Sequence, residues 1–540
     1  MIPMAQVGEE DRKRRPRFIK PASLWQKTLL LALLLWPWLN PFAPGPSPQV
    51  LPLLISWGCL AGVLAFWSVL SARQIALGWL LAGLLSTVIA LCQYFGVASA
   101  FAPWMSLTDP GNVYANLRQR NQFASLTGIA LAAAIWFVLH TKDKPQNQRL
   151  LVLAAVFLGL GNALSASRTG LVQFICLSSL AALWPIWRTR QVVQVLLLAW
   201  AAYLFGSLVL PYLNLSSALH QGIFSRFVVE NPSCASRRVL WANVLDLISL
   251  KPWLGWGWGE LDYAQFATLF DGTRYCEIAD NAHNLLLHLA VELGVPLALL
   301  ACGGLTFAVA RAKAWREANL QRQMAWAVLL VIGLHSLLEY PLWYGSFQMA
   351  VVMCLWLLWH HRPANAVSVS HSTALTTPIT TPITTPLAGP VSVQIHHSAT
   401  PQLSGWRNLL ASLVMLAVIF IAWDYQRVSQ IYLVSADRMP NYRSDTLNKI
   451  RDTRFFKAQA QFAELTLTPL TSDNAAYLNV MAHQLLHFSP EARVIKQLID
   501  SAALLGKQDE VAFYRLRFKA AFPEAYQQWL ATQPKSPPPQ

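Results

Sequence analysis

The sequence predicts an all-α protein that crosses a membrane many times, and three observations support this fold class. Of the 540 residues, 55% are hydrophobic and only 12% are charged, whereas soluble domains carry roughly 25% charged residues. Several apolar runs, most clearly Leu77–Val97 and Val192–Leu213, reach or exceed the roughly 18 residues that a membrane-crossing helix needs. The loops between these runs alternate between basic and less basic, as they do in multipass membrane proteins.

Hydropathy predicts about eleven spans, with approximate limits 24–41, 50–71, 75–97, 122–140, 149–164, 169–187, 192–212, 283–310, 325–341, 344–360 and 406–424. The N-terminus is basic, and so is every second loop after it, through Arg73, Lys142, Lys144, Arg149, Arg188, Arg190, Arg311, Lys313, Arg316 and Arg322. Because Lys and Arg collect on the cytoplasmic side of membrane proteins, we expect these loops in the cytoplasm. The long loop 213–282 and the C-terminal region then face the periplasm.

The formal net charge of +15 follows from these cytoplasmic loops, so we expect no nucleic-acid partner. The basic segment Asp11–Lys20 precedes the first apolar run without a small-residue cleavage site, which predicts a retained signal anchor. Uncharged Thr-Thr-Pro repeats in Thr376–Pro390 predict a flexible linker. The predicted parts are a cytoplasmic N-terminus (1–23), a transmembrane catalytic domain (24–361), a cytoplasmic linker (362–405), a last transmembrane helix (406–424), a periplasmic helical domain (425–531) and a disordered tail (532–540).

Two of the seven cysteines, Cys234 and Cys276, lie in the long periplasmic loop, where thiols are oxidised. We expect them to form a disulfide; the alternative is a pair of free thiols in a mobile loop. The other five lie in apolar runs, where cysteine behaves as a small hydrophobe. No cysteine or histidine spacing indicates a metal site, and we expect neither a metal nor a cofactor.

Five polar motifs, far apart in sequence, all fall beside apolar runs on the predicted periplasmic side: 116–124, 165–170, 237–259, 282–294 and 335–344. Arginine is costly at membrane depth, so an arginine beside a span is a functional candidate, and its guanidinium is suited to binding phosphate. The alternative is a headgroup anchor. The small polar neighbours of Arg168 in SASRTG favour function there; the other candidates are Arg120, Arg237 and Arg238.

Histidines and carboxylates in these motifs supply the candidates for proton transfer. His283 stands at the outer start of a span, where a neutral imidazole can accept a proton near pH 7; the alternative is a structural histidine. His335 and Glu339 are spaced i, i+4 and share a helical face. They could bind zinc, but no third ligand is evident, and a hydrogen-bonded structural pair is the better interpretation.

The motifs resemble the O-antigen ligase and polymerase superfamily. The resemblance is carried by QRN-x-x-A (Gln119–Ala124), S-x-SRTG (Ser165–Gly170), R-x-x-x-W followed by P-W-x-G-x-G (Arg237–Gly257), AHN-x-x-L (Ala282–Leu287) and E-x-G (Glu292–Gly294). LEYPLWY (Leu338–Tyr344) and DY-x-R-x-S-Q-x-Y (Asp424–Tyr432) are most similar to PglL-type bacterial protein O-oligosaccharyltransferases, also called pilin glycosylases. The Thr/Pro linker is longer than expected for that family.

The resemblance implies a glycosyltransferase of the inner membrane with its active site facing the periplasm. The donor would be an oligosaccharide on undecaprenyl pyrophosphate, and the acceptor a Ser or Thr hydroxyl of a pilin-like periplasmic protein. Transfer would invert the anomeric centre without a metal. His283 would be catalytic, and arginines matching Arg168 and Arg237, with Arg120 and Arg238, would bind the pyrophosphate. The residues expected to shape the site are Gln119, Asn121, Asn284, Glu339, Tyr340 and Tyr344.

Three other functions stay open at the level of sequence. An O-antigen ligase would use the same donor with lipid A-core as acceptor, and a Wzy-type polymerase would extend another lipid-linked glycan. A multipass transporter is the rival from a different class. It would place its ionisable groups near the bilayer midplane, whereas the polar motifs here lie at one rim.

Overall fold

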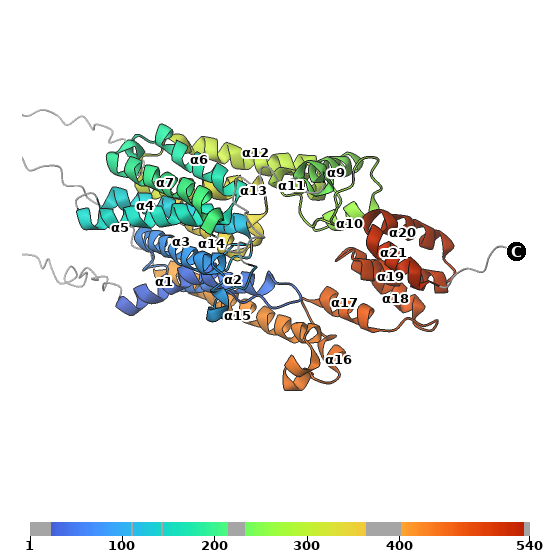
Figure 1. Ribbon diagram of the computed structural model, residues 1–540. Helices are drawn as coiled ribbons and strands as arrows, with labels where there is room; N and C mark the ends of the chain where they lie inside the picture. The colour runs from blue at the N-terminus through green and yellow to red at the C-terminus, as the bar shows by residue number, and fades with distance from the viewer. Residues whose placement is uncertain (1–22, 110–111, 142–143, 214–232, 363–400, 534–540) are drawn as a thin grey trace, which may run out of the picture.

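The computed structural model describes residues 23–109, 112–141, 144–213, 233–362 and 401–533, and all regular structure within these ranges is helical. The basic segment of the predicted signal anchor, most of the linker and most of the tail lie outside the described residues. The helices form a bundle with a smaller helical domain beyond one end of it, as Figure 1 shows. The bundle helices are α1 (Leu24–Leu39), α2 (Val50–Ala65), α3 (Ala72–Tyr94), α4 (Arg120–His140), α5 (Pro145–Ser165), α6 (Arg168–Leu183), α7 (Arg190–Leu213), α12 (Val295–Ala312), α13 (Leu320–Ser336), α14 (Gly345–His360) and α15 (Pro401–Ser429).

Helix α4 is the centre of the bundle and packs against α3, α5, α6 and α13. Its apolar stretch is 89% buried, which agrees with a sequence that is apolar on every face. Small residues allow the close contacts: a Cβ added at Gly83 of α3 would lie 2.4 Å from the Cβ of Ala130 in α4. Close helix approach through small residues is typical of membrane bundles.

Within the part of the chain that the structure describes, six helices are long and apolar enough to cross a membrane, judged by length and composition. Two of them, α12 and α15, are only 6% and 17% buried over their apolar windows. Apolar surface on this scale is characteristic of contact with lipid or with another protein. These helices support the membrane assignment, while the predicted number of about eleven spans and their orientation stay predictions.

The span predicted over 283–310 is not one helix. Helix α11 (Leu285–Leu293) ends at Gly294, and α12 begins at Val295. Gly294 has φ 87°, and a Cβ there would lie 2.1 Å from the carbonyl oxygen of Trp253. A hydropathy profile does not detect this break, because the residues on both sides of it are apolar and the profile averages over them. The consequence is that α11 packs against α9 (Arg237–Leu250), outside the candidate span α12.

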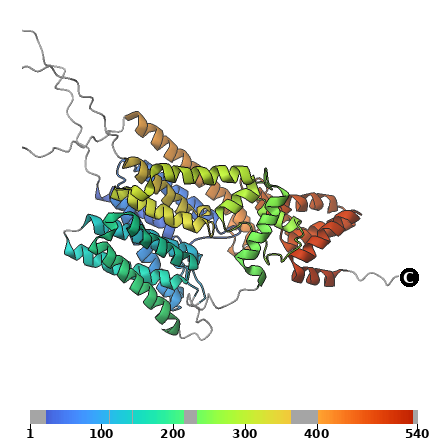
Figure 2. The same ribbon diagram turned by 90° about the horizontal axis from the view of Figure 1, so that it is seen from above.

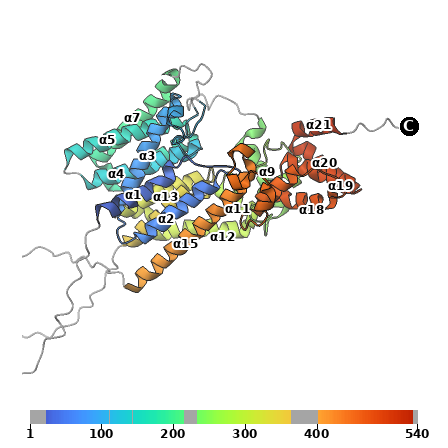
Figure 3. The same ribbon diagram turned by 90° about the horizontal axis from the view of Figure 1, so that it is seen from below.

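The C-terminal domain is a stack of short helices at the same end of the bundle as α9 and α11, as Figures 1 and 2 show. It comprises α17 (Lys457–Leu467), α18 (Ala475–Leu486), α19 (Ala492–Leu504), α20 (Gln508–Ala521) and α21 (Pro523–Thr532). Seen from below in Figure 3, α15 runs along the bundle toward this domain. At that end Asp424 Oδ2 accepts hydrogen bonds from Thr453 Oγ1 and from the backbone N–H groups of Arg454 and Phe455 at 2.9–3.0 Å. The DY-x-R-x-S-Q-x-Y segment therefore joins the domain to the bundle.

The long loop and the C-terminal domain share one hydrophobic core. Phe266, in the loop helix α10 (Leu261–Ala267), is fully buried among residues of the C-terminal domain and stacks on Tyr514 with ring centroids 6.4 Å apart. Arg517 Nε donates to the carbonyl oxygen of Ala267 at 2.6 Å, and His487 Nδ1 lies 2.7 Å from Glu260 Oε2. The loop that leads to His283 is thus fixed at its middle by the C-terminal domain.

We expect Phe266→Ala to lower the free energy of unfolding of this shared core by about 3–5 kcal/mol, the usual cost of truncating a buried phenylalanine. Limited proteolysis of the membrane-embedded protein would then cut the C-terminal domain and residues 233–282 more rapidly. The matched control is Phe455→Ala, because Phe455 is 55% exposed. Equal proteolysis rates for the two variants would contradict the shared core.

Candidate active site

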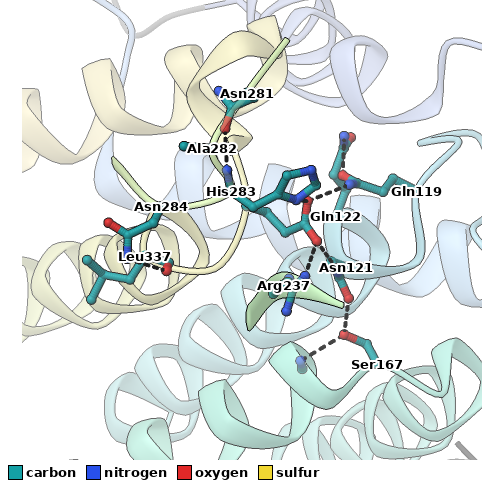
Figure 4. A network of polar contacts seen from close by, with 12 residues as sticks. Gln119, Asn121, Gln122, Ser167, Arg237, Asn281, Ala282, His283, Asn284 and Leu337 are labelled. Carbon is teal, nitrogen blue, oxygen red and sulfur yellow. Dashed lines mark hydrogen bonds and ion pairs between the residues drawn. The ribbon is translucent and has the colours of Figure 1, made fainter. Parts of the chain in front are cut away.

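The candidate site lies at the end of the bundle where α4 and α6 begin and α13 ends. Gln119 is the N-cap residue of α4 in extended conformation, and Ser167 caps α6 by accepting a hydrogen bond from Gly170 N–H at 2.9 Å. Helix α13 ends at Ser336, so that Glu339 lies in the turn beyond it. Figure 4 shows how the side chains of these segments point toward one another.

Glu339 joins the segments. Its side chain is 5% exposed, and Oε1 accepts hydrogen bonds from Asn121 Nδ2 at 3.0 Å and from the guanidinium of Arg237. Oε2 accepts from Gln119 Nε2 at 3.2 Å and lies 2.8 Å from His283 Nδ1. Four donors from three distant parts of the sequence therefore converge on one buried carboxylate, which satisfies the requirement that buried charge be paired.

The surroundings of Glu339 keep it ionised. Burial alone would raise the pKa of Glu339, but the hydrogen bond from His283 and the charges of His283 and Arg237 lower it below its ordinary value. The carboxylate consequently carries a negative charge throughout the neutral pH range.

The backbone presents His283 in a defined orientation. His283 has φ 51°, and its N–H donates to Asn281 Oδ1 at 2.8 Å. The next residue, Asn284, caps α11 by accepting from Leu287 N–H at 3.1 Å and donates from Nδ2 to the carbonyl oxygen of Leu337 at 3.2 Å. With Nδ1 directed at Glu339, the other ring nitrogen, Nε2, makes no hydrogen bond within the described residues. His283 is 26% exposed, so that nitrogen is available to a substrate.

Polar side chains inside the bundle make hydrogen bonds to residues of the candidate site. Ser167 Oγ donates to Asn121 Oδ1 at 2.6 Å. His335 does not pair with the side chain of Glu339: its Nδ1 lies 2.9 Å from Ser125 Oγ. The expected structural pair of His335 and Glu339 is therefore wrong, because the helix ends between them and turns Glu339 toward His283. The same divergence speaks against a shared zinc site.

The aromatic turn after Glu339 closes one side of the site. The ring of Tyr340 packs edge-on against His283 with centroids 5.2 Å apart. The rings of Tyr340 and Tyr344 stack on each other with centroids 6.1 Å apart. Burial raises the pKa of both tyrosines above the ordinary value, so both hydroxyls stay protonated and remain hydrogen-bond donors.

The four candidate arginines differ in position. Arg237 contacts Glu339 directly. Arg120 donates from Nε to Asn112 Oδ1 at 2.8 Å, on the loop before α4. Arg168 is exposed at the start of α6, one residue after the buried Ser167, and Arg238 is exposed on α9.

Sequence reasoning did not single out Gln122, Ser167 and Asn281. Gln122 Nε2 donates to Gln119 Oε1 at 2.8 Å, and the spacing i, i+3 between two glutamines was a signal for this contact. Asn281 holds His283 through a short-range turn, and Ser167 contacts Asn121 across 46 positions of sequence. A single sequence offers no signal that separates either residue from an ordinary polar residue at a helix end.

The expected disulfide between Cys234 and Cys276 is present, with Cα atoms 5.2 Å apart. It joins the segment before Arg237 to the approach to His283, and so holds two of the site's residues near each other. The two cysteines are 42 positions apart, and a loop of this length gains about 4 kcal/mol in the chain-entropy account.

We expect Cys234→Ser to reduce activity at least about tenfold while leaving the bundle folded, because Arg237 and His283 lose their covalent tie. Thiol labelling of intact spheroplasts, with and without reductant, checks the bond itself. Labelling of both cysteines before reduction would contradict it, and Cys302→Ser is the control, since Cys302 is a free cysteine.

Comparison with known proteins gives three family matches. Residues 150–302 match the O-antigen ligase family, residues 113–137 match the protein glycosylation ligase family, and residues 323–536 match the C-terminal region of the virulence factor membrane-bound polymerases. These ranges contain the motifs on which the resemblance was predicted. They confirm the resemblance to PglL-type O-oligosaccharyltransferases within the O-antigen ligase superfamily.

Two curated relatives, both from Acinetobacter baylyi, are similar to the chain. One is a general O-oligosaccharyltransferase, 28% identical over 303 residues, which are 53% of this chain and 51% of the relative. The other is a ComP-specific O-oligosaccharyltransferase, 25% identical over 285 residues, which are 52% of this chain and 50% of the relative. The chain thus spans about half the length of the curated relatives it matches.

Proposed function

We propose that this chain transfers an oligosaccharide from undecaprenyl pyrophosphate to Ser or Thr hydroxyls of periplasmic proteins such as pilin. The observation that carries the proposal is the pair formed by His283 and Glu339, held 2.8 Å apart at one end of an apolar bundle. Its context supports it, because the matched families include a protein glycosylation ligase and both relatives are O-oligosaccharyltransferases.

The proposed reaction uses the two ring nitrogens of His283 in different roles. Nδ1–H donates to Glu339, which fixes the tautomer and leaves a lone pair on Nε2. Nε2 takes the proton of the acceptor hydroxyl while that oxygen attacks the anomeric carbon. The bond from the anomeric carbon to the pyrophosphate oxygen breaks, the configuration inverts, and undecaprenyl pyrophosphate leaves. Glu339 stabilises the imidazolium that forms.

Charge on the leaving pyrophosphate would be stabilised by arginines at the rim, without a metal or cofactor. We assign this role to Arg168, Arg237, Arg238 and Arg120. Arg237 would exchange its contact with Glu339 Oε1 for the pyrophosphate when the donor binds, while Glu339 Oε2 stays beside His283. Gln119, Asn121, Asn284, Tyr340 and Tyr344 would shape the site.

In the proposed orientation the basic loops lie in the cytoplasm of the bacterium, and the site, the disulfide and the C-terminal domain face the periplasm. Such a topology accounts for an oxidised cysteine pair. It also favours an enzyme over a transporter, whose ionisable groups would lie near the bilayer midplane rather than at one end of the bundle.

We expect Arg168→Lys to lower transfer about 10- to 100-fold at ordinary donor concentration, because an ammonium cannot reproduce the bidentate bonds of a guanidinium. Turnover of a radiolabelled lipid-linked donor is the measurement. Arg188→Lys is the matched control, since Arg188 caps carbonyl oxygens of α6 at that helix's far end. If both variants keep normal turnover, Arg168 is only a charge anchor.

Co-expression with a glycan pathway and a pilin, followed by mass spectrometry of the pilin, tests the proposal. A mass increment equal to the whole oligosaccharide on Ser or Thr is expected. Glycan found instead on lipid A-core would assign an O-antigen ligase. Lengthening of the lipid-linked glycan would assign a Wzy-type polymerase, which the match over residues 323–536 keeps as the second candidate.

A further inference from the structure

A cavity of about 200 Å³ lies beside the candidate site, at the same end of the bundle. We call it the helix-start cavity, because its wall includes the first residues of three helices. The lining residues that matter are Gln49 and Pro52 of α2, Arg118 and Gln122 around the start of α4, and Gly345 and Ser346 of α14. Gln122 also bonds to Gln119, which bonds to Glu339, so one layer of side chains separates the cavity from the catalytic carboxylate.

Two of the three helix starts, those of α2 and α14, leave positive charge uncompensated. The N-cap residues Gln49, Gln119 and Tyr344 make no side-chain cap hydrogen bond, and the first turns of α2, α4 and α14 contain no acidic residue. Each helix start carries roughly half a positive charge from its unpaired N–H groups. Helices usually balance this charge with a capping oxygen or a carboxylate. The start of α4 has the carboxylate of Glu339 beside its first turn, whereas the starts of α2 and α14 have neither.

A fourth helix, α1, ends at the cavity, but its carbonyl oxygens already have partners. Asn116 Nδ2 donates to the carbonyl oxygen of Leu39 at 2.7 Å, and the guanidinium of Arg118 donates to that of Pro41. Asn40 N–H donates to the carbonyl oxygen of Trp36 at 3.0 Å. The negative end of α1 is therefore satisfied within the protein and does not cancel the positive helix starts.

The groups left without partners are donors. Ser346 is 5% exposed, lines the cavity, and its hydroxyl makes no hydrogen bond within the described residues. The backbone N–H groups of Gly345 and Ser346 also have no acceptor there. Arg118 is exposed and bonds to Pro41 through one nitrogen, which leaves other guanidinium N–H groups for a ligand. None of the described lining residues is acidic.

The tight start of α14 is what brings these donors to the cavity. A Cβ added at Gly345 would lie 2.4 Å from the Cβ of Ser56 in α2. Only glycine lets α14 begin this close to α2. The result is two helix starts side by side, facing a space that an anion of small size would fill.

We propose that the helix-start cavity binds a phosphate-type oxyanion carried by a membrane lipid. Its volume is below the roughly 300–1,000 Å³ of sites for drug-sized ligands, so it takes one small group rather than a whole oligosaccharide. Two lipids carry such a group, the polyprenyl donor and an ordinary phospholipid. Naming the donor as the occupant rests on the proposed function; the oxyanion chemistry does not.

Binding of inorganic pyrophosphate to the purified full-length protein in detergent tests the oxyanion site, with the midpoint of thermal unfolding as the readout. We expect pyrophosphate to raise the midpoint of the wild type and of Arg73→Gln, a control at the opposite end of the bundle. Arg118→Gln should weaken the apparent affinity at least about tenfold, and Ser346→Asp should abolish it by placing a carboxylate among the helix starts. Unchanged affinity in Arg118→Gln would overturn the proposal, and loss of affinity in Arg168→Gln would then assign the bound anion to the rim arginines.

A second arm identifies the lipid. Undecaprenyl phosphate and dioleoyl phosphatidylglycerol are titrated into the same variants. Tighter, Arg118-dependent binding of undecaprenyl phosphate assigns the donor, and tighter Arg118-dependent binding of phosphatidylglycerol assigns a phospholipid; either supports the oxyanion site. Binding of both lipids without dependence on Arg118 or Ser346 would refute it. This readout is independent of glycan transfer, so failure of the proposed function would leave its result intact.

Discussion

Replacing His283 by alanine is expected to abolish oligosaccharide transfer while leaving the protein in the membrane. The change removes the only group in the network with a free basic nitrogen, Nε2, directed away from Glu339 among the described residues. General base catalysis contributes about 10²- to 10⁴-fold to a reaction rate. The rate of transfer by the variant should therefore be at least about a hundredfold below the wild-type rate. Mass spectrometry of the acceptor and the amount of enzyme in the membrane are the two measurements.

His140→Ala is the matched control, because His140 is exposed at the far end of α4 and packs on Trp136. It should retain wild-type transfer. Equal loss of transfer in His140→Ala and His283→Ala would contradict the catalytic assignment, and so would normal transfer in both.

Replacing Glu339 by glutamine is expected to lower transfer at least about a hundredfold. A neutral amide cannot stabilise the imidazolium that His283 becomes, and it no longer matches the charge of Arg237. Glu317→Gln is the control, because Glu317 also pairs with an arginine, Arg322 at 2.6 Å, but near the start of α13. A similar rate in both variants would show that the charge of Glu339 is dispensable.

The pH dependence of stability provides an independent check on Glu339. Its pKa is lowered in the folded protein, so the carboxylate contributes stability that is present above the ordinary carboxyl pKa and lost as the pH falls through the lowered value. The difference in unfolding midpoint between the wild type and Glu339→Gln should thus be large at neutral pH and shrink in acid. A difference that stays constant from neutral pH to strong acid would contradict the charged pair.

Much of the fold could be predicted because each membrane helix corresponds to a long apolar run in the sequence. Apart from 283–310, each predicted span corresponds to one helix, and the amphipathic segment from Arg237 forms α9. The break at Gly294 was missed because hydropathy averages across a single residue whose importance comes from contact with Trp253. The insertion of Phe266 into the C-terminal core was also invisible, since a long-range contact leaves no periodic signal.

The sequence predicted which residues belong to the candidate site, but not which of them contact one another. His283, Glu339, Gln119, Asn121 and Arg237 do form one network. The sequence predicted a hydrogen-bonded pair of Glu339 and His335, because the two residues are four positions apart on an expected helix. That helix ends at Ser336, and the partner of Glu339 is instead a histidine from another motif. Which polar groups meet across a bundle depends on helix ends, which hydropathy locates only to within several residues.

The measurement that tests the account most directly is transfer by the purified, reconstituted protein from a lipid-linked oligosaccharide to an acceptor pilin in the presence of a chelator. The account predicts that the wild type moves the whole oligosaccharide to a Ser or Thr of the pilin at an undiminished rate. His283→Ala and Glu339→Gln should fail under the same conditions. Strict dependence on a divalent ion, or undiminished transfer by either variant, would contradict catalysis by the histidine–carboxylate pair.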